Sequence, residues 1–151
     1  MLCLKSRLKT PSYIFVVVLC VSALGACTSS PAINTDGTVS ESDRRLARAF
    51  DKQESNLQVE GEGTVSRLLS DDNDGSRHQR FIVTLKSGQT LLMAHNIDLA
   101  PRINSLEVGD EIEFFGEYEW NDKGGIIHWT HHDPNRQHTP GWIKHDGRVY
   151  Q

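Results

Sequence analysis

The amino-acid sequence predicts a mainly β fold, a small five-stranded barrel preceded by a short N-terminal amphipathic helix. Apolar and polar residues alternate with period two through most of the chain after Asn56, and turn-forming residues divide this part into five segments. Paired glycines interrupt the first segment, as expected where a long strand bends. We therefore place the barrel domain at residues 57–151, after a leader at residues 1–26 and a tether with the helix at residues 27–56.

The leader has the organisation of a signal peptide. Lys5, Arg7 and Lys9 precede an apolar run at residues 13–23, which is shorter than the roughly 20 apolar residues of a membrane-spanning helix. The run ends in Leu-Gly-Ala-Cys and resembles a bacterial lipobox, in which Cys27 becomes the lipidated first residue of the mature protein. We expect an exported protein attached to a membrane through this lipid. An ordinary secreted protein with a cysteine near its cleavage site is the alternative.

The residue after the cysteine also bears on location. It is Thr28 rather than aspartate, and the resemblance to lipoproteins then implies transfer to the outer membrane, with the domain facing the periplasm. Cys3, Cys20 and Cys27 all lie in or at the end of the leader. The exported domain therefore has no cysteine left for a disulfide, and its core must stabilise it unaided.

The charge of the mature chain disfavours nucleic acid as a partner. The sequence has 16 Lys and Arg against 20 Asp and Glu, and the leader removes three basic residues and no acidic one. The mature chain thus keeps 13 basic against 20 acidic residues, a net charge of −7. Proteins that bind nucleic acid need the opposite sign.

The segment before the barrel combines a tether and a helix. Residues 28–40 are mainly Ser, Thr, Pro, Asn, Asp and Gly, which is typical of a flexible tether. Leu46, Ala49 and Phe50 then follow at helical spacing within residues 40–55. We expect this helix to pack on the barrel. A helix that binds a partner is the alternative, although it has few apolar positions to offer.

Five strands are expected in the barrel domain, at residues 57–69, 78–85, 90–95, 110–120 and 126–130. Gly61 and Gly63 mark the bend of the first strand, and Phe81, Val83 and Leu85 form the inward face of the second. The fourth strand directs apolar residues inward and glutamates outward, namely Ile112, Phe114, Tyr118 and Trp120 against Glu111, Glu113, Glu117 and Glu119. A hairpin at residues 121–125 leads into the fifth strand, and a terminal hairpin can turn at Asp146 and Gly147.

The connections favour one barrel topology. Residues 96–110 are long enough for one helical turn and a loop, and Pro101 limits anything more. Five strands, a bent first strand and this connection after the third strand resemble an OB-fold, a small, partly open Greek-key barrel. A barrel suits a domain without disulfides because closing the sheet removes exposed edges. An SH3-like barrel and a nuclease-type variant of the OB barrel are the alternatives.

Several blocks of sequence carry a family resemblance. The blocks are RHQRFIVTL, AHNIDLAPR, GEYEWND, HWTHHDP and GWI. Together they resemble a family of small exported bacterial proteins that is described only as a domain of unknown function, and the likeness covers nearly everything from Val59 to Gly147. The resemblance implies no activity, cofactor or catalytic residue.

The histidines are the main candidates for a functional site, as ligands for a substrate or for a metal such as zinc, and the sequence does not identify the cofactor. The candidate residues are His78, His95, His131, His132 and Asp133. Along a straight strand His128 and His132 would be about 13 Å apart, so a local chelate needs the chain to turn after residue 130. Histidines at strand ends also commonly bind neighbouring backbone groups, and a purely structural role is the alternative.

The sequence leaves two functional hypotheses in place. The first is a non-catalytic binding module of the cell envelope with an unknown ligand, to which Trp142 contributes an exposed aromatic ring that could stack on a sugar. The second is a metal-dependent hydrolase of the zinc type, acting on phosphodiesters as nuclease-type barrels do, with His131 or His132 as the base. The mature chain has neither a cysteine nor a nucleophile-elbow serine to act as nucleophile.

Overall fold

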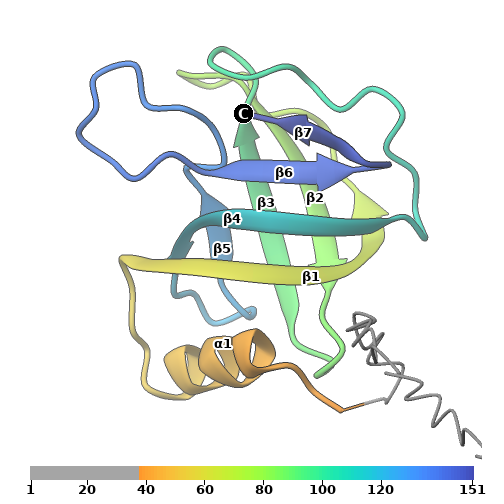
Figure 1. Ribbon diagram of the computed structural model, residues 1–151, viewed down its shortest axis with the longest axis vertical. Coiled ribbons are helices and arrows are strands. Elements are labelled where there is room, and N and C mark those ends of the chain that lie inside the picture. Colours follow the sequence, from red (N-terminus) through yellow and green to blue (C-terminus); the bar gives the residue numbers. More distant parts are fainter. Residues whose placement is uncertain (1–37) are drawn as a thin grey trace, which may run out of the picture. The chain divides into compact units, whose positions relative to one another are not determined.

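The computed structural model describes residues 38–151, which fold into one helix and seven strands (Figure 1). The elements are α1 (Glu41–Asp51), β1 (Leu57–Leu68), β2 (His78–Thr84), β3 (Thr90–Asn96), β4 (Glu111–Glu119), β5 (Ile126–His128), β6 (Trp142–His145) and β7 (Arg148–Tyr150). No helix in this range is long and apolar enough to cross a membrane. The predicted leader, the lipidation residue Cys27 and most of the tether lie outside the described residues.

Five of the strands form a closed barrel. They are arranged in the order β1–β2–β3–β5–β4, and β4 pairs back with β1. Strands β3 and β5 run parallel, whereas the other pairs of the barrel run antiparallel. Because this order is that of an OB-fold, the predicted mainly β, five-stranded OB-fold-like barrel is confirmed.

Strand β1 pairs with both β4 and β2, and its register is regular through Gly61 and Gly63 and shifts between Val65 and Arg67. A side chain at Gly61 would lie 2.5 Å from the ring of Phe114, and one at Gly63 would lie 2.5 Å from Val83. Both neighbours are core residues of the strands that pair with β1. The missing side chains therefore make room for the core where β1 crosses it.

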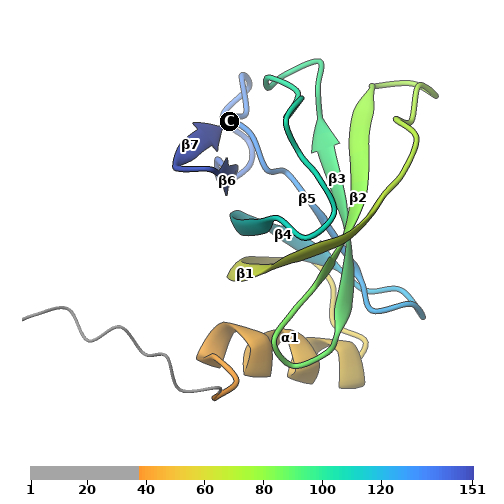
Figure 2. The ribbon, with the colours of Figure 1, turned by 90° about the vertical axis from the view of Figure 1, so that its right-hand side faces the viewer.

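The core contains the inward side chains of the barrel and two residues of the helix. The inward residues predicted for the second and fourth strands are buried, namely Phe81, Val83, Leu85, Ile112, Phe114 and Tyr118. Trp120 is partly buried and packs against this core. Leu46 and Ala49 of α1 are at most 1% exposed, so the helix covers one end of the barrel, as both ribbon views show (Figures 1 and 2). The prediction that the helix packs on the barrel is confirmed.

A buried carboxylate attaches the helix to the sheet. Ser40 caps α1, and its hydroxyl accepts the N–H of Asp43 at 3.0 Å. The carboxylate of Asp43 accepts the hydroxyl of Ser40 at 2.9 Å and the N–H of Ser87, in the turn between β2 and β3, at 3.0 Å. A buried charge needs such partners, and here they connect the helix to the barrel.

The terminal hairpin is present as β6 and β7, with Asp146 and Gly147 at its turn. Strand β6 pairs with the first half of β4, and β5 pairs with the second half. Since β1 occupies the opposite edge of β4, β5 and β6 follow one another along the same edge. Residues 129–141 form the loop between them.

Candidate metal centre

The loop at residues 129–141 leaves the barrel at Trp129 and stands out beside β6 (Figure 1). The φ angle of Trp129 is 53°, in the left-handed region, which turns the chain away from the direction of β5. The predicted strand at residues 126–130 is therefore two residues too long. At the base of the loop the N–H of Gly141 donates to the carbonyl of His131 at 3.0 Å, which brings the chain back to the sheet.

Asp133, a predicted ligand, organises this loop. Its carboxylate accepts the backbone N–H groups of Asn135 at 2.9 Å, Gln137 at 2.5 Å and His138 at 2.9 Å. These hydrogen bonds, that of Asn135 first, hold the pKa of Asp133 below its usual range. The oxygens of Asp133 thus already have backbone partners, and the residue shapes the loop.

His95, another predicted ligand, is a fully buried histidine with partners for both ring nitrogens. Its Nε2–H donates to the carbonyl of Pro101 at 3.2 Å, and its Nδ1 accepts the hydroxyl of Thr130 at 2.8 Å. Burial lowers the pKa of His95 to about 4. His95 is therefore neutral near pH 7, and it joins β3 to the start of the loop and to the connection after β3.

The other predicted histidines lie at separate places. Nδ1–H of His131, which is 3% exposed, donates to the carbonyl of His132 at 2.7 Å. His132 is exposed, and His78 donates from Nδ1 to the carbonyl of Ser76 at 2.7 Å. In residues 38–151 no three ligand atoms of the predicted set come close enough to share one ion. Backbone groups engage at least one side-chain atom of His78, His95, His131 and Asp133, and a role of the predicted set in binding a ligand or a metal stays a prediction.

Trp142, the predicted aromatic contact, lies on β6 and is partly buried. Its ring centroid is 6.3 Å from that of Phe115 on the neighbouring strand β4, with 31° between the two planes. Part of the indole surface is therefore covered by the protein's own aromatic ring. This position leaves less of the ring for a sugar than a fully exposed tryptophan would offer.

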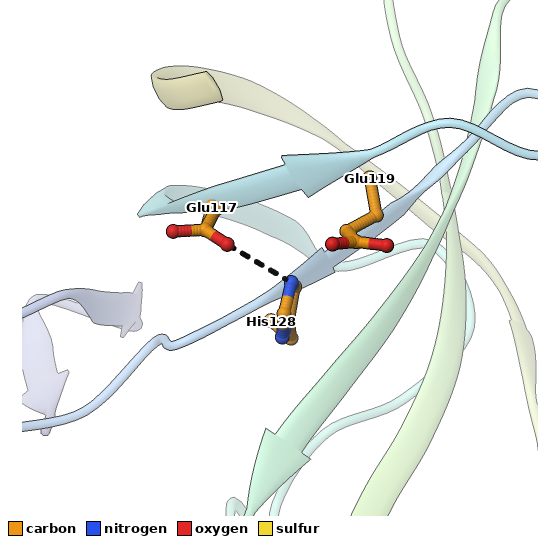
Figure 3. A group of neighbouring side chains, drawn as sticks. All are labelled: Glu117, Glu119 and His128. Carbon is orange, nitrogen blue, oxygen red and sulfur yellow. Dashed lines mark ion pairs between the residues drawn. The ribbon is translucent and has the colours of Figure 1, made fainter. Parts of the chain in front are cut away.

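A different group of side chains comes together on the outer surface of β4 and β5 (Figure 3). It consists of Glu117, Glu119 and His128, and one ligand atom of each lies within 4.8 Å of the others. Glu117 and Glu119 share a face because they are two residues apart on one strand. The antiparallel register places His128 directly opposite Glu117. We call these three residues the metal-ligand cluster.

The distances within the metal-ligand cluster suit a shared ion better than a direct contact. Nε2 of His128 is 3.7 Å from Oε1 of Glu117, which is too long for a hydrogen bond. This nitrogen is buried and has no hydrogen-bond partner. With zinc bonds of about 2.0–2.1 Å at tetrahedral angles, neighbouring ligand atoms lie about 3.4 Å apart. The gap between the two side chains is therefore close to that of two ligands on one ion.

Electrostatics also favour a cation at this place. Burial lowers the pKa of His128, against the opposing effect of the charges on Glu117 and Glu119. A neutral imidazole is the form that binds a metal. Two carboxylates on one outer face also repel each other, and a divalent cation between them would relieve that repulsion.

Only the glutamates of this cluster were predictable from the sequence. The outward direction of Glu117 and Glu119 and the hairpin at residues 121–125 are both predictable from the alternation and the turn residues. A hairpin loop at residues 121–125 would pair Trp120 with Ile126 and place His128 opposite the inward Tyr118. The structure instead pairs Glu119 with Ile126 and His128 with Glu117, and this shift of one residue moves His128 to the outer face.

Fold and site together define a small closed β-barrel of OB topology that carries a candidate metal centre on its outer face. The chain belongs to the family described as Protein of unknown function (DUF3465), whose model matches residues 30–151. This confirms the resemblance to a family without an assigned function. No curated protein and no solved structure matches the chain.

Proposed function

We propose that this protein is a lipid-anchored, non-catalytic binding module of the cell envelope, and that its ligand is a divalent metal ion of the zinc type. The observation that carries the metal assignment is the metal-ligand cluster, in which the partnerless Nε2 of His128 faces Glu117 across a gap of 3.7 Å. Imidazole and carboxylate are common ligands of zinc. The predicted leader at residues 1–26, followed by Cys27, supports attachment to the outer membrane, with the domain in the periplasm.

Zinc binding is expected to depend on the glutamates of the cluster and on no other outward glutamate of β4. The mature chain, with Cys27→Ser and without a histidine tag, should bind a single zinc ion per chain. Glu119→Gln should weaken binding by more than the roughly 10–100-fold that loss of an outer-shell partner costs. Titration against a chromophoric chelator measures the affinity, and elemental mass spectrometry measures the stoichiometry.

Glu111→Gln is the matched control for this experiment. Glu111 lies on the same strand, faces outward and is exposed, so its replacement changes the net charge equally without touching the cluster. Equal zinc affinity of the two variants would contradict the proposed site. Hydrolysis of a phosphodiester substrate by the zinc-loaded protein, lost on chelation, would instead support the metal-dependent hydrolase.

The lipid anchor has a separate test. When the full chain is produced in a bacterium supplied with labelled palmitate, the mature protein should carry the label and fractionate with the outer membrane. Cys27→Ser should abolish the label, because the cysteine is the residue that a lipobox acylates. Labelling that persists in this variant, or an unlabelled soluble parent protein, would contradict the anchor.

A further inference from the structure

His138 lies beside the metal-ligand cluster although it belongs to the loop at residues 129–141. Its Nδ1 is 3.9 Å from Oε2 of Glu117, while Nε2 of His128 is 3.7 Å from Oε1 of the same carboxylate. The two imidazoles therefore approach the two oxygens of one carboxylate. Both gaps exceed hydrogen-bond length. The ring nitrogens of His138 lie outside the group of ligand atoms that are all within 4.8 Å of one another, so the His138 side chain has to move closer to share an ion with that group.

The ring of Trp129 stacks on that of His138 beside the cluster. The indole and the imidazole are stacked, with 3.7 Å between their centroids and 15° between their planes. Trp129 directly follows His128, so the stack is attached to the strand end that carries a cluster residue. An imidazole that stacks through its face keeps its ring nitrogens, which lie at the edge, available for a ligand.

The backbone of His138 is fixed independently of its ring. Its N–H donates to the carboxylate of Asp133 at 2.9 Å, together with the N–H groups of Asn135 and Gln137. The side chain itself is 38% exposed, so it can close the remaining distance by rotating about its own bonds. Asp133 thus acts as a positioning residue for His138.

We propose that His138 is the fourth protein ligand of the metal-ligand cluster and that it completes a closed, four-coordinate shell around a zinc-type ion. This inference rests on the proposed metal binding and adds the ligand that decides what the site can do. Structural zinc sites have four protein ligands, whereas catalytic sites have three and keep one position for water. With His138 in place, the shell has no position for a reacting water, as a binding module requires.

Zinc affinity and histidine NMR together test this ligand set on the mature chain with Cys27→Ser. His138→Ala should lower zinc affinity by more than roughly 100-fold, and Asp133→Ala should lower it by roughly 10–100-fold as an outer-shell change. His132→Ala is the control, because His132 is exposed on the same loop and lies outside the cluster. In the parent protein, zinc should shift the ¹⁵N resonances of Nδ1 of His138 and Nε2 of His128.

The two proposals fail in different ways. Equal zinc affinity of the parent protein and His138→Ala, with no zinc-dependent shift of the His138 ring nitrogens, would overturn the fourth ligand and leave the three-residue site intact. A parent protein that binds no zinc would overturn both. A large loss of zinc affinity in His138→Ala supports ligation by His138 only if the circular dichroism spectrum of the variant is unchanged. The zinc-dependent NMR shift of the His138 ring nitrogens in the parent protein tests ligation without any variant.

Discussion

Replacing Gly124 with alanine is expected to prevent the barrel from closing and to lower the free energy of unfolding by at least about 4 kcal/mol. Gly124 has a φ angle of +118°, which L side chains rarely adopt. An added Cβ would also overlap the carbonyl oxygen of Thr90, at the start of β3. Because that oxygen belongs to the backbone, no side-chain rotation can relieve the overlap.

The overlap falls where the barrel closes. The N–H of Leu92 donates to the carbonyl of Gly125 at 3.0 Å, next to the residues through which β3 and β5 pair. If Gly124 moves away from Thr90, this parallel pairing is the first contact to be lost. Loss of the β3–β5 pairing would open the sheet and expose its core side chains to water.

Gly88→Ala isolates the conformational part of this effect. Gly88 also has a positive φ, +87°, but an added Cβ would meet nothing within 4 Å. We expect this variant to lose only about 1–2 kcal/mol, the usual cost of the left-handed conformation. Urea unfolding followed by circular dichroism compares the two variants with the parent protein. Similar midpoints for both would mean that the turn relaxes and that close contact with Thr90 is not needed for closure.

The strands and the helix were predictable because their signals are local. The alternation that includes Phe81 and Val83 requires a half-buried strand, and both side chains are buried in the core. The spacing of Leu46 and Ala49 likewise gave the face of the helix that packs on the barrel. In each case the period of the apolar residues determines which side chains share a face, and burial of that face follows.

The sequence did not predict the course of the chain after His128. In a straight strand that continued past residue 130, His128 and His132 would be about 13 Å apart. The two residues were therefore not expected to bind one metal ion unless the chain turned. The left-handed conformation at Trp129 instead folds the chain back, so that His138 lies 3.9 Å from Glu117. No local pattern marks such a conformation at a tryptophan, which is a residue that seldom adopts it.

The difference between the predicted and the observed site comes from partners that are remote in sequence. His95 looked like a ligand at a strand end, but its nitrogens bind Pro101 and Thr130. Whether a histidine is free or engaged depends on such tertiary neighbours, which residue type and spacing do not reveal. The outward direction of the glutamates on β4 needed only strand alternation, whereas the register that places His128 opposite Glu117 differs by one residue from that of the predicted hairpin.

Because His95 is buried, the protein is expected to lose stability as the pH falls from 6.5 to 4, and this is the second large expected effect. In the unfolded chain the imidazole has its usual pKa of 6.5, whereas burial lowers its pKa to about 4 in the folded protein. Between these values the unfolded chain binds a proton that the folded protein does not bind. The contribution of His95 to the free energy of unfolding is therefore fully present above pH 6.5. It is lost as the pH falls to 4, which lowers the free energy of unfolding by about 3 kcal/mol.

His95→Gln should remove most of this pH dependence. The glutamine amide can still donate to the carbonyl of Pro101 but does not titrate, so the variant should be less stable at pH 7 and change less between pH 6.5 and 4. Hydrogen-bonded carboxylates such as Asp110 and Asp133 have lowered pKa values and titrate mainly below this window. His128, whose pKa is also lowered by burial, contributes in the same direction in both proteins.

Urea unfolding of the zinc-free protein at a series of pH values measures the effect, with His132→Ala as the exposed-histidine control. This control removes an exposed histidine and keeps the buried His95, so the loss of stability between pH 6.5 and 4 should persist. A profile in His95→Gln that is as steep as that of the parent protein would contradict the prediction. It would mean that the His95 ring accepts a proton in the folded state. His95 would then again be a candidate for binding or proton transfer, since a protonatable histidine inside the barrel has a chemistry that a neutral one lacks.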